Sequence, residues 1–215
     1  MTLTLAVASA LARQCAPQVA PTTMVALVLN ESALNELVIG DNTSHRVYKP
    51  ASRAEAEALA QSLIGQGHSI DMGLAQINSH TAGRIGLPVS DAFDPCASIA
   101  AAGRLMVSTY RKVAPRAPTV QHALAATLST YNTGDSVRGI ENGYVARVYR
   151  AAARSAGTVP SATTITTNYQ RTVRPGGDAL AAGEMTKGAA SPASWAVFGA
   201  PATSADVFPS TPKGR

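Results

Sequence analysis

One short apolar segment limits the possible folds of this chain more than any other feature. Residues Met24 to Leu29 carry no charge and lead directly to Glu31 and Ser32. As a helix, this segment is apolar on nearly every side, so the sequence predicts that it lies buried in the core of a globular domain. Such a helix brings a lone carboxyl group, that of Glu31, to the edge of the core.

Glu31 has two interpretations at this stage. The negative end of a helix dipole and the loss of solvent both raise the pKa of a carboxyl group. A carboxyl group that stays protonated near neutral pH can serve as a general acid. The alternative is a glutamate that ends a helix and turns into solvent. The segment alone leaves both interpretations open.

Length and composition fit one medium-sized domain with an additional segment. The chain has 215 residues and a net charge of +5, and its 18 lysines and arginines form no run. This scattered charge does not predict nucleic-acid binding. No apolar run approaches the ~20 residues of a transmembrane helix. The four histidines are not at metal-ligand spacing, so the sequence predicts no metal and no cofactor.

Capping and helix-breaking residues divide the first 154 residues into a series of helices with a few extended segments. We therefore predict an α+β fold that is mainly α. Ser52, Asp94 and Thr119 are predicted helix caps, and Pro21 and Pro95 suit the first helical turn. A β-hairpin is expected within Val38 to Tyr48 and an extended segment over Ser69 to Asn78. The predicted helices cover about Leu3 to Arg13, Pro21 to Glu31, Ser52 to Gln66, His80 to Gly86, Asp94 to Val113, Thr119 to Tyr131 and Ile140 to Ala153.

The N-terminal segment has two interpretations. Residues 1–12 are apolar and small, as in a degenerate signal segment, although they lack the positive charge that usually begins one. Alternatively, they form the first helix of the domain, with Leu3, Val7 and Leu11 on one face. The helical spacing favours the second interpretation.

Three further motifs follow Glu31-Ser32 along the chain. They are Gly73-Leu74-Ala75-Gln76-Ile77-Asn78, then Tyr131-Asn132-Thr133-Gly134, then Asn142-Gly143-Tyr144-Val145. In this order and spacing they resemble the lysozyme-like transglycosylase (SLT) domain, and more closely the VirB1-like lytic transglycosylases of bacterial type IV secretion systems. The resemblance covers roughly residues 11–150. It implies one lysozyme-like, mainly α domain over residues 1–154 with a small β element.

The resemblance also implies a function and a catalytic acid. Glu31 would protonate the glycosidic oxygen between N-acetylmuramic acid and N-acetylglucosamine in peptidoglycan. It would then act as base on the muramoyl 6-hydroxyl, which closes on C1 to give a 1,6-anhydro sugar. Because the substrate supplies the nucleophile, one carboxylate suffices, whereas ordinary glycosidases use two. Asp71 and Glu36 are the nearest candidates for a second acid in a hydrolytic muramidase. A glycan-binding or assembly module without activity is the third alternative.

The remaining motif residues would bind substrate. By resemblance, the Ser32 hydroxyl fixes Glu31 or contacts the sugar. Tyr131 would lie near Glu31, and Tyr144 would contribute a hydroxyl group near the acid. Gln76 and Asn78 share one face of the extended segment, where their amides would bond acetamido and hydroxyl groups. Gly73 allows either close approach of a sugar ring or a special dihedral angle. Asn132 would support the cleft.

One residue departs from the family pattern. The family usually has methionine where this chain has Ala75. We therefore expect a side chain to be missing from the cleft region, with weakened substrate contact there.

The resemblance further implies a periplasmic location, with peptidoglycan glycan strands as substrate and secretion-system components as candidate partners. Disulfide bonds persist in that compartment, which favours a Cys15–Cys96 bond over two buried thiols. Such a bond would close a loop of 82 residues, counting both ends, and would stabilise the fold by roughly 4–5 kcal/mol in the chain-entropy model.

The composition changes after Arg154. Residues 155–215 are rich in Ala, Thr, Ser, Gly and Pro and show no helical period, so the sequence predicts a largely disordered tail. Ser194 to Phe198 contains the only tryptophan, Trp195. This patch is either a docking motif for a partner or incidental.

Overall fold

The structure, a computed structural model, describes residues 2–156. Within them it confirms the predicted mainly α fold with a small sheet. The predicted docking patch at 194–198 and nearly all of the predicted disordered tail lie outside the described residues, and the boundary between domain and tail remains a prediction.

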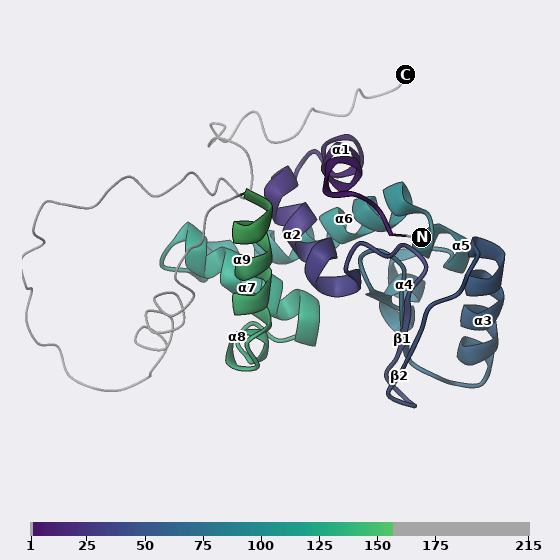
Figure 1. The fold of residues 1–215 in the computed structure, drawn as a ribbon. Coiled ribbons are helices and arrows are strands. Elements are labelled where there is room, and N and C mark those ends of the chain that lie inside the picture. The colour runs from purple at the N-terminus through teal and green to yellow at the C-terminus, as the bar shows by residue number, and fades with distance from the viewer. Residues whose placement is uncertain (1, 157–215) are drawn as a thin grey trace, which may run out of the picture.

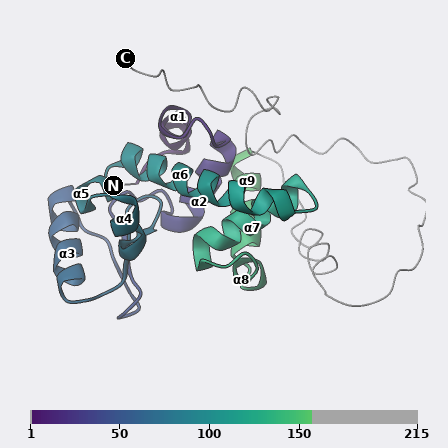
Figure 2. The same cartoon turned by 180° about the vertical axis from the view of Figure 1, so that it is seen from behind.

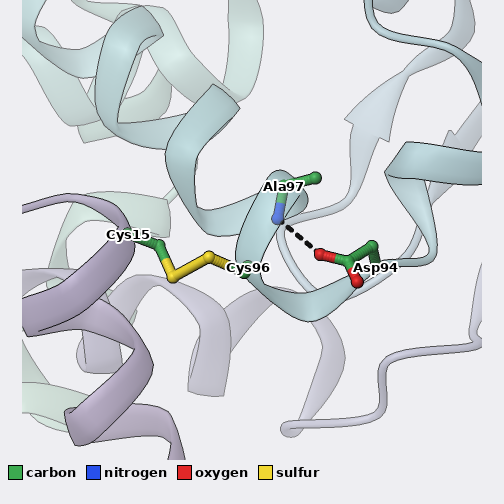
Figure 3. Close-up of a disulfide and its surroundings, with 4 residues drawn as sticks. All are labelled: Cys15, Asp94, Cys96 and Ala97. Atoms are coloured by element: carbon green, nitrogen blue, oxygen red, sulfur yellow. Dashed lines mark hydrogen bonds between the residues drawn. A yellow bond between two sulfur atoms is a disulfide. The ribbon is translucent and has the colours of Figure 1, made fainter.

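Helices dominate the architecture, and most begin where the sequence places a cap. Ser52 accepts a hydrogen bond from the backbone N–H of Glu55, Asp94 from that of Ala97 (Figure 3), and Thr119 from that of His122. These caps satisfy backbone donors that would otherwise lack partners. The helices are α1 (Leu5–Cys15), α2 (Pro21–Ser32), α3 (Arg53–Gly65), α4 (Ser79–Ile85), α5 (Val89–Ala92), α6 (Pro95–Val113), α7 (Val120–Thr133), α8 (Arg138–Glu141) and α9 (Tyr144–Ala156), with a 3₁₀ turn, η1 (Ala114–Arg116).

Helix α2 forms the centre of the domain, as its apolar composition predicts. The side chains from Thr23 to Val28 are all buried, and α2 packs against α1 and α9. Figure 1 shows α7, α8 and α9 on one side of α2, and the strands with α3 on the other. The long helix α6 crosses behind and connects the two sides (Figure 2).

Four short antiparallel strands form the sheet, in the order β2-β1-β3-β4. The hairpin of β1 and β2 agrees with the prediction. The prediction of one continuous extended segment over Ser69 to Asn78 is wrong. Gly73 and Gln76 have φ angles of 70° and 48°, so the chain turns between two strands. The strands are β1 (Ile39–Asp41), β2 (Arg46–Tyr48), β3 (Ile70–Met72) and β4 (Ile77–Asn78).

Asp41 ties the hairpin to the loop before β3. Its buried carboxylate accepts hydrogen bonds from Thr43 and Ser44 and lies 2.7 Å from Nδ1 of His68. Burial alone would raise the pKa of Asp41, but the hydrogen bonds from Ser44, His68 and Thr43 outweigh burial and lower this pKa well below its ordinary value. The hairpin is thereby held beside β3, where it contributes to the site described below.

Two other predictions about helices need correction. Helix α1 exists, but Ala8 and Ala12 face the core while Val7 is 44% exposed, because the small alanines allow close packing against α2 and α6. The predicted final helix is divided into α8 and α9 by a turn in which Gly143 has a φ of 77°. This break places Tyr144 in the first turn of α9.

A disulfide bond between Cys15 and Cys96 joins the end of α1 to the start of α6 (Figure 3). The two cysteines lie 81 positions apart in the sequence, so the bond links the N-terminal helix to the middle of the chain. Among residues 2–156, no helix combines the length and apolar character needed to cross a membrane.

Candidate active site

A cleft of about 700 Å³ runs between the sheet and the helices, and Glu31 lies in its wall. Five parts of the chain line it: the end of α2, the sheet, α4, α6 and the end of α7. The lining residues are Glu31, Asn42, Asp71, Gln76, Ile77, Asn78, Thr81, Arg84, Leu105, Thr109, Lys112, Thr130, Tyr131, Asn132 and Gly134.

Glu31 occupies the last turn of α2 and is half-buried. Burial raises the pKa of its carboxyl group to about 7, from an ordinary 4.5. A hydrogen bond from Tyr144 lowers this pKa, the negative charge of Asp71 raises it, and the positive charge of Arg147 lowers it. The carboxyl group is thus poised to exist in both protonation states near neutral pH, as a group that donates and then accepts a proton requires.

Tyr144 makes the direct contact with this acid. Its hydroxyl donates a hydrogen bond to Oε1 of Glu31. Burial and the negative charge of Glu31 raise the pKa of Tyr144 well above its ordinary value, so the hydroxyl keeps its proton and remains a donor. The guanidinium of Arg147 lies 5.9 Å from the centre of the Tyr144 ring. The start of α9 therefore supplies both groups that favour the ionised form of Glu31.

Tyr131 also lies in the cleft wall, but its hydroxyl has a structural partner. It donates a 2.8 Å hydrogen bond to the backbone carbonyl of Ala75, while burial and the charge of Glu31 raise its pKa. Ala75 is fully buried and does not line the cleft. The expectation that Ala75 leaves a gap in the cleft wall is therefore wrong, because this position faces the core.

Asp71 is a second carboxylate in the same cleft. Its two oxygens accept hydrogen bonds of 2.9 Å from the side-chain amides of Asn42 and Asn78. The sequence offered Asp71 only as a candidate for a second acid, and the structure places it where its charge raises the pKa of Glu31.

Gln76 and Asn78 line the cleft, but they do not share a face of an extended strand. The amide nitrogen of Gln76 donates to the backbone carbonyls of Val38 and Gly73. Asn78 donates to Ser69 and Asp71, and its oxygen accepts from the backbone N–H of His80 as the cap of α4. Both side chains therefore hold the turn and the strand ends together, and their N–H donors are already in use.

Gly73 adopts a left-handed backbone conformation, which was one of the two expectations for this residue. Its φ is 70°, and a Cβ atom there would lie 1.9 Å from the backbone oxygen of Ala92. Ser32 differs from its expected role, since its buried hydroxyl donates to the carbonyl of Val28 and not to Glu31. Neither residue lines the cleft.

The end of α7 closes the cleft near Tyr131. Asn132 accepts a hydrogen bond from the side chain of Asn142, which connects this end of α7 to the turn before α9. Gly134 is the left-handed cap of α7, with a φ of 73°.

Several lining residues were not predicted from the sequence. Asn42 belongs to the hairpin turn, Arg84 to α4 and Lys112 to α6. Each resembles an ordinary surface residue in its local sequence, so only the fold brings them together. Within residues 2–156, no group of three or more His, Cys, Asp or Glu side chains is arranged to hold a metal ion.

Comparison with known proteins agrees with the motif order. Residues 9–148 match the family model of the transglycosylase SLT domain. The chain is 38% identical over 141 residues to protein virB1 of Agrobacterium fabrum, covering 66% of this chain and 57% of that protein. It is 36% identical over 148 residues to the type IV secretion system protein virB1 of Brucella abortus, covering 66% and 62% respectively.

The chain thus spans about six tenths of the length of these relatives. No solved structure matches it. The family model, by contrast, covers most of the chain and includes Glu31, both tyrosines and the whole cleft lining. The chain therefore belongs to the transglycosylase SLT domain family and is VirB1-like within it.

Proposed function

We propose that this protein is a lytic transglycosylase of the bacterial periplasm. It cleaves the β-1,4 bond between N-acetylmuramic acid and N-acetylglucosamine in peptidoglycan and leaves a 1,6-anhydro end. One observation carries the proposal: a carboxyl group with a pKa of about 7, that of Glu31, in the wall of a cleft of about 700 Å³. A cleft of this size has room for sugar residues of an extended chain.

Glu31 takes both proton-transfer roles in the reaction. Its protonated carboxyl group gives a proton to the glycosidic oxygen as the bond to C1 breaks. The resulting carboxylate then accepts the proton of the muramoyl 6-hydroxyl, whose oxygen bonds to C1 and closes the anhydro ring. The proton count balances without water. A pKa of about 7 suits a group that must serve as acid and then as base at neutral pH.

The surrounding residues set the balance between the protonated and ionised forms of Glu31, and each step of the reaction uses one of these forms. Burial and the charge of Asp71 favour the protonated acid, and the hydroxyl of Tyr144 and the charge of Arg147 favour the carboxylate. The charge of Asp71 would also stabilise the positive charge that develops at C1 in the transition state.

A hydrolytic muramidase is the second candidate, and the position of Asp71 favours it specifically. A two-carboxylate mechanism needs a second acid in the same cleft, and Asp71 meets that condition. The two candidates differ in their products, because water as nucleophile leaves a reducing muramic end.

Mass spectrometry of muropeptides released from purified sacculi distinguishes these functions. We expect products with 1,6-anhydro ends from the wild type and none from Glu31→Gln. Reducing ends that depend on both Glu31 and Asp71 would establish the hydrolase instead. Release of no product by the folded wild-type protein would favour a glycan-binding or assembly module.

The biological setting follows from the relatives. A transglycosylase similar to a type IV secretion system protein would open the wall locally for a secretion or conjugation machine. We propose the same setting here, with secretion-system components as partners through residues 155–215.

A further inference from the structure

The turn between β1 and β2 supplies a cleft-lining side chain that the mechanism above does not use. Asn42 follows the last residue of β1, is exposed, and lines the cleft together with Glu31 and Asp71. Its side-chain amide donates a 2.9 Å hydrogen bond to Oδ2 of Asp71, which is 29 positions away in the sequence. The hairpin therefore contacts the same carboxylate whose charge acts on Glu31.

The backbone of this turn is fixed to the segment before β3. The N–H of Asn42 donates to the carbonyl of Ser69 at 2.9 Å, and the N–H of Ser69 donates to Oγ1 of Thr43 at 3.0 Å. The buried carboxylate of Asp41 accepts from the backbone N–H groups of Thr43 and Ser44. Asn42 thus presents its amide from a turn whose backbone is held in place.

The carboxylate of Asp71 lies between two amides from different elements. Asn78, in β4, donates to its Oδ1 atom and Asn42 donates to its Oδ2 atom, both at 2.9 Å. A single donor would leave the carboxylate free to turn about that contact, whereas two donors fix both of its oxygens. The second donor therefore sets the direction in which Asp71 presents its charge.

The two amides differ in what else they hold. Asn78 also donates to Oγ of Ser69 and accepts from the backbone N–H of His80 as the cap of α4, so its replacement would disturb that helix. Among residues 2–156, the side chain of Asn42 makes its hydrogen bond to Asp71 alone. A substitution at Asn42 therefore tests the placement of Asp71 without removing a helix cap.

Groups from three elements act on or respond to the charge of Glu31. From α9 come the hydroxyl of Tyr144, which donates to Glu31, and the positive charge of Arg147. From β3 comes the negative charge of Asp71, and on α7 the pKa of Tyr131 is raised by the charge of Glu31. Since α9 and the sheet lie on opposite sides of α2 (Figure 1), Glu31 is influenced from both sides. The hairpin holds the member of this set that comes from the sheet.

We propose that Asn42 is a positioning residue, which holds the carboxylate of Asp71 in the cleft so that its negative charge acts on Glu31. This inference rests on the proposed function, because it concerns the acid of the same cleft. Without the amide of Asn42, one oxygen of Asp71 is released to solvent, where water screens its charge. The charge of Asp71 raises the pKa of Glu31 to its value of about 7, so release of Asp71 should lower this pKa.

The first test measures the acid without catalysis. NMR titration of the side-chain carboxyl carbon of Glu31 in isotope-labelled protein gives its pKa, and Glu31→Gln identifies the signal. We expect Asn42→Ala to lower this pKa, in the same direction as Asp71→Asn and by a smaller amount. In the Asp71→Asn background, Asn42→Ala should leave the pKa of Glu31 unchanged, because Asn42 acts through Asp71.

The second test is a double-mutant cycle of kcat/KM for product release from sacculi near neutral pH. Asn42→Ala should lower kcat/KM by roughly two- to tenfold, the span expected for the loss of one hydrogen bond. In the Asp71→Asn background, the same substitution should change kcat/KM by less than about twofold. Equal loss in the two backgrounds would overturn the inference.

Thr43→Val is the matched control. Thr43 lies next to Asn42 in the same turn and accepts from the N–H of Ser69, so this substitution removes a link of the hairpin without touching Asp71. Both the pKa of Glu31 and kcat/KM should stay at their wild-type values. A similar change in Thr43→Val would mean that Asn42 acts through the stability of the turn, and the positioning role would be lost. So would a pKa of Glu31 that is unchanged or raised in Asn42→Ala.

The two tests keep this inference apart from the proposed function. If the folded wild type releases no product, the proposed function fails, and the NMR titration still decides whether Asn42 places the charge of Asp71. If the wild type releases product while neither the pKa of Glu31 nor kcat/KM responds to Asn42→Ala, the inference fails alone.

Discussion

Replacement of Tyr144 by phenylalanine isolates one hydrogen bond to Glu31, the proposed catalytic acid. The substitution keeps a buried ring of nearly the same shape and removes only the hydroxyl that donates to Glu31. That hydrogen bond is the strongest of the influences that lower the pKa of Glu31, after burial has raised it. Its loss should therefore raise this pKa further.

The magnitude follows from the charge-assisted character of the bond. Such a bond contributes about 1.5 kcal/mol, and one pKa unit corresponds to about 1.4 kcal/mol, so the pKa should rise by roughly one unit. With a pKa of about 7, half of Glu31 is protonated at pH 7, against about 0.3% for a carboxyl group at its ordinary 4.5. The loss of activity at high pH should thus move from about pH 7 in the wild type to about pH 8.

The assay is the initial rate of soluble product release from sacculi between pH 5 and pH 9, at low substrate concentration so that kcat/KM is measured. Tyr149→Phe is the matched control. Tyr149 is on the same helix, and its buried hydroxyl has no hydrogen-bond partner among residues 2–156. We expect the pH profile of this control to coincide with that of the wild type.

Two results would refute the reasoning. A midpoint in Tyr144→Phe that stays at the wild-type pH, or moves to lower pH, would mean that the hydroxyl does not stabilise the ionised acid. A similar shift in Tyr149→Phe would mean that the profile responds to general changes in α9 and not to the contact with Glu31.

The remaining predictions concern stability and the core of the site. The raised pKa of Glu31 implies stability that is complete below pH 4.5 and is lost as pH rises through about 7, so Glu31→Gln should raise Tm at pH 8 with little effect at pH 5. A Tm difference independent of pH would contradict this. Replacement of both Cys15 and Cys96 by alanine should lower the free energy of unfolding by about 2–5 kcal/mol in denaturant titrations, because the bond closes a long loop; an unchanged midpoint would exclude it. Gly73→Ala should lower the free energy of unfolding by at least 1–2 kcal/mol, because the new Cβ meets a backbone oxygen; the positive φ alone accounts for ~1 kcal/mol of this loss. Gly67→Ala is the control, since Gly67 has a similar φ but open space around it. Tyr149→Phe should leave stability equal or higher, because it removes a buried hydroxyl that has no partner in the described part of the chain.

The sequence predicted the helical framework well because its signals are local. A serine, aspartate or threonine cap acts within one helical turn, and Ser52, Asp94 and Thr119 each bond the backbone N–H three residues on. The buried helix α2 was predicted for a similar reason, since a segment that is apolar on every side has no stable position at a surface.

The packing face of the first helix was harder to predict. Hydrophobic spacing placed Leu3, Val7 and Leu11 on one face. Leu3 and Leu11 are partly buried against the core and Val7 is 44% exposed, whereas Ala8 and Ala12 are fully buried. Close approach of α1 to α2 and α6 selects small side chains, and the sequence pattern does not record how close two helices will come.

The motif Gly73 to Asn78 shows what a sequence resemblance identifies and what it leaves open. Gly73 provides the positive φ, Gln76 bonds two backbone carbonyls across the turn, and Asn78 caps α4. These are folding roles, so an inactive protein with this turn would need the same residues. Their presence therefore establishes the shape of the cleft more firmly than its chemistry.

The chemistry depends instead on residues that this turn places opposite the helices. The amide of Asn78 donates a hydrogen bond to Asp71, and the charge of Asp71 raises the pKa of Glu31. The hydroxyl of Tyr144, on a helix far along the sequence, lowers the same pKa. A transglycosylase and a hydrolase can share the turn and Glu31, because both need a buried acid. They differ in what attacks C1, and in this cleft Asp71 is the carboxylate positioned to influence that choice. The product formed by Asp71→Asn thus says more about the mechanism than any substitution within the turn.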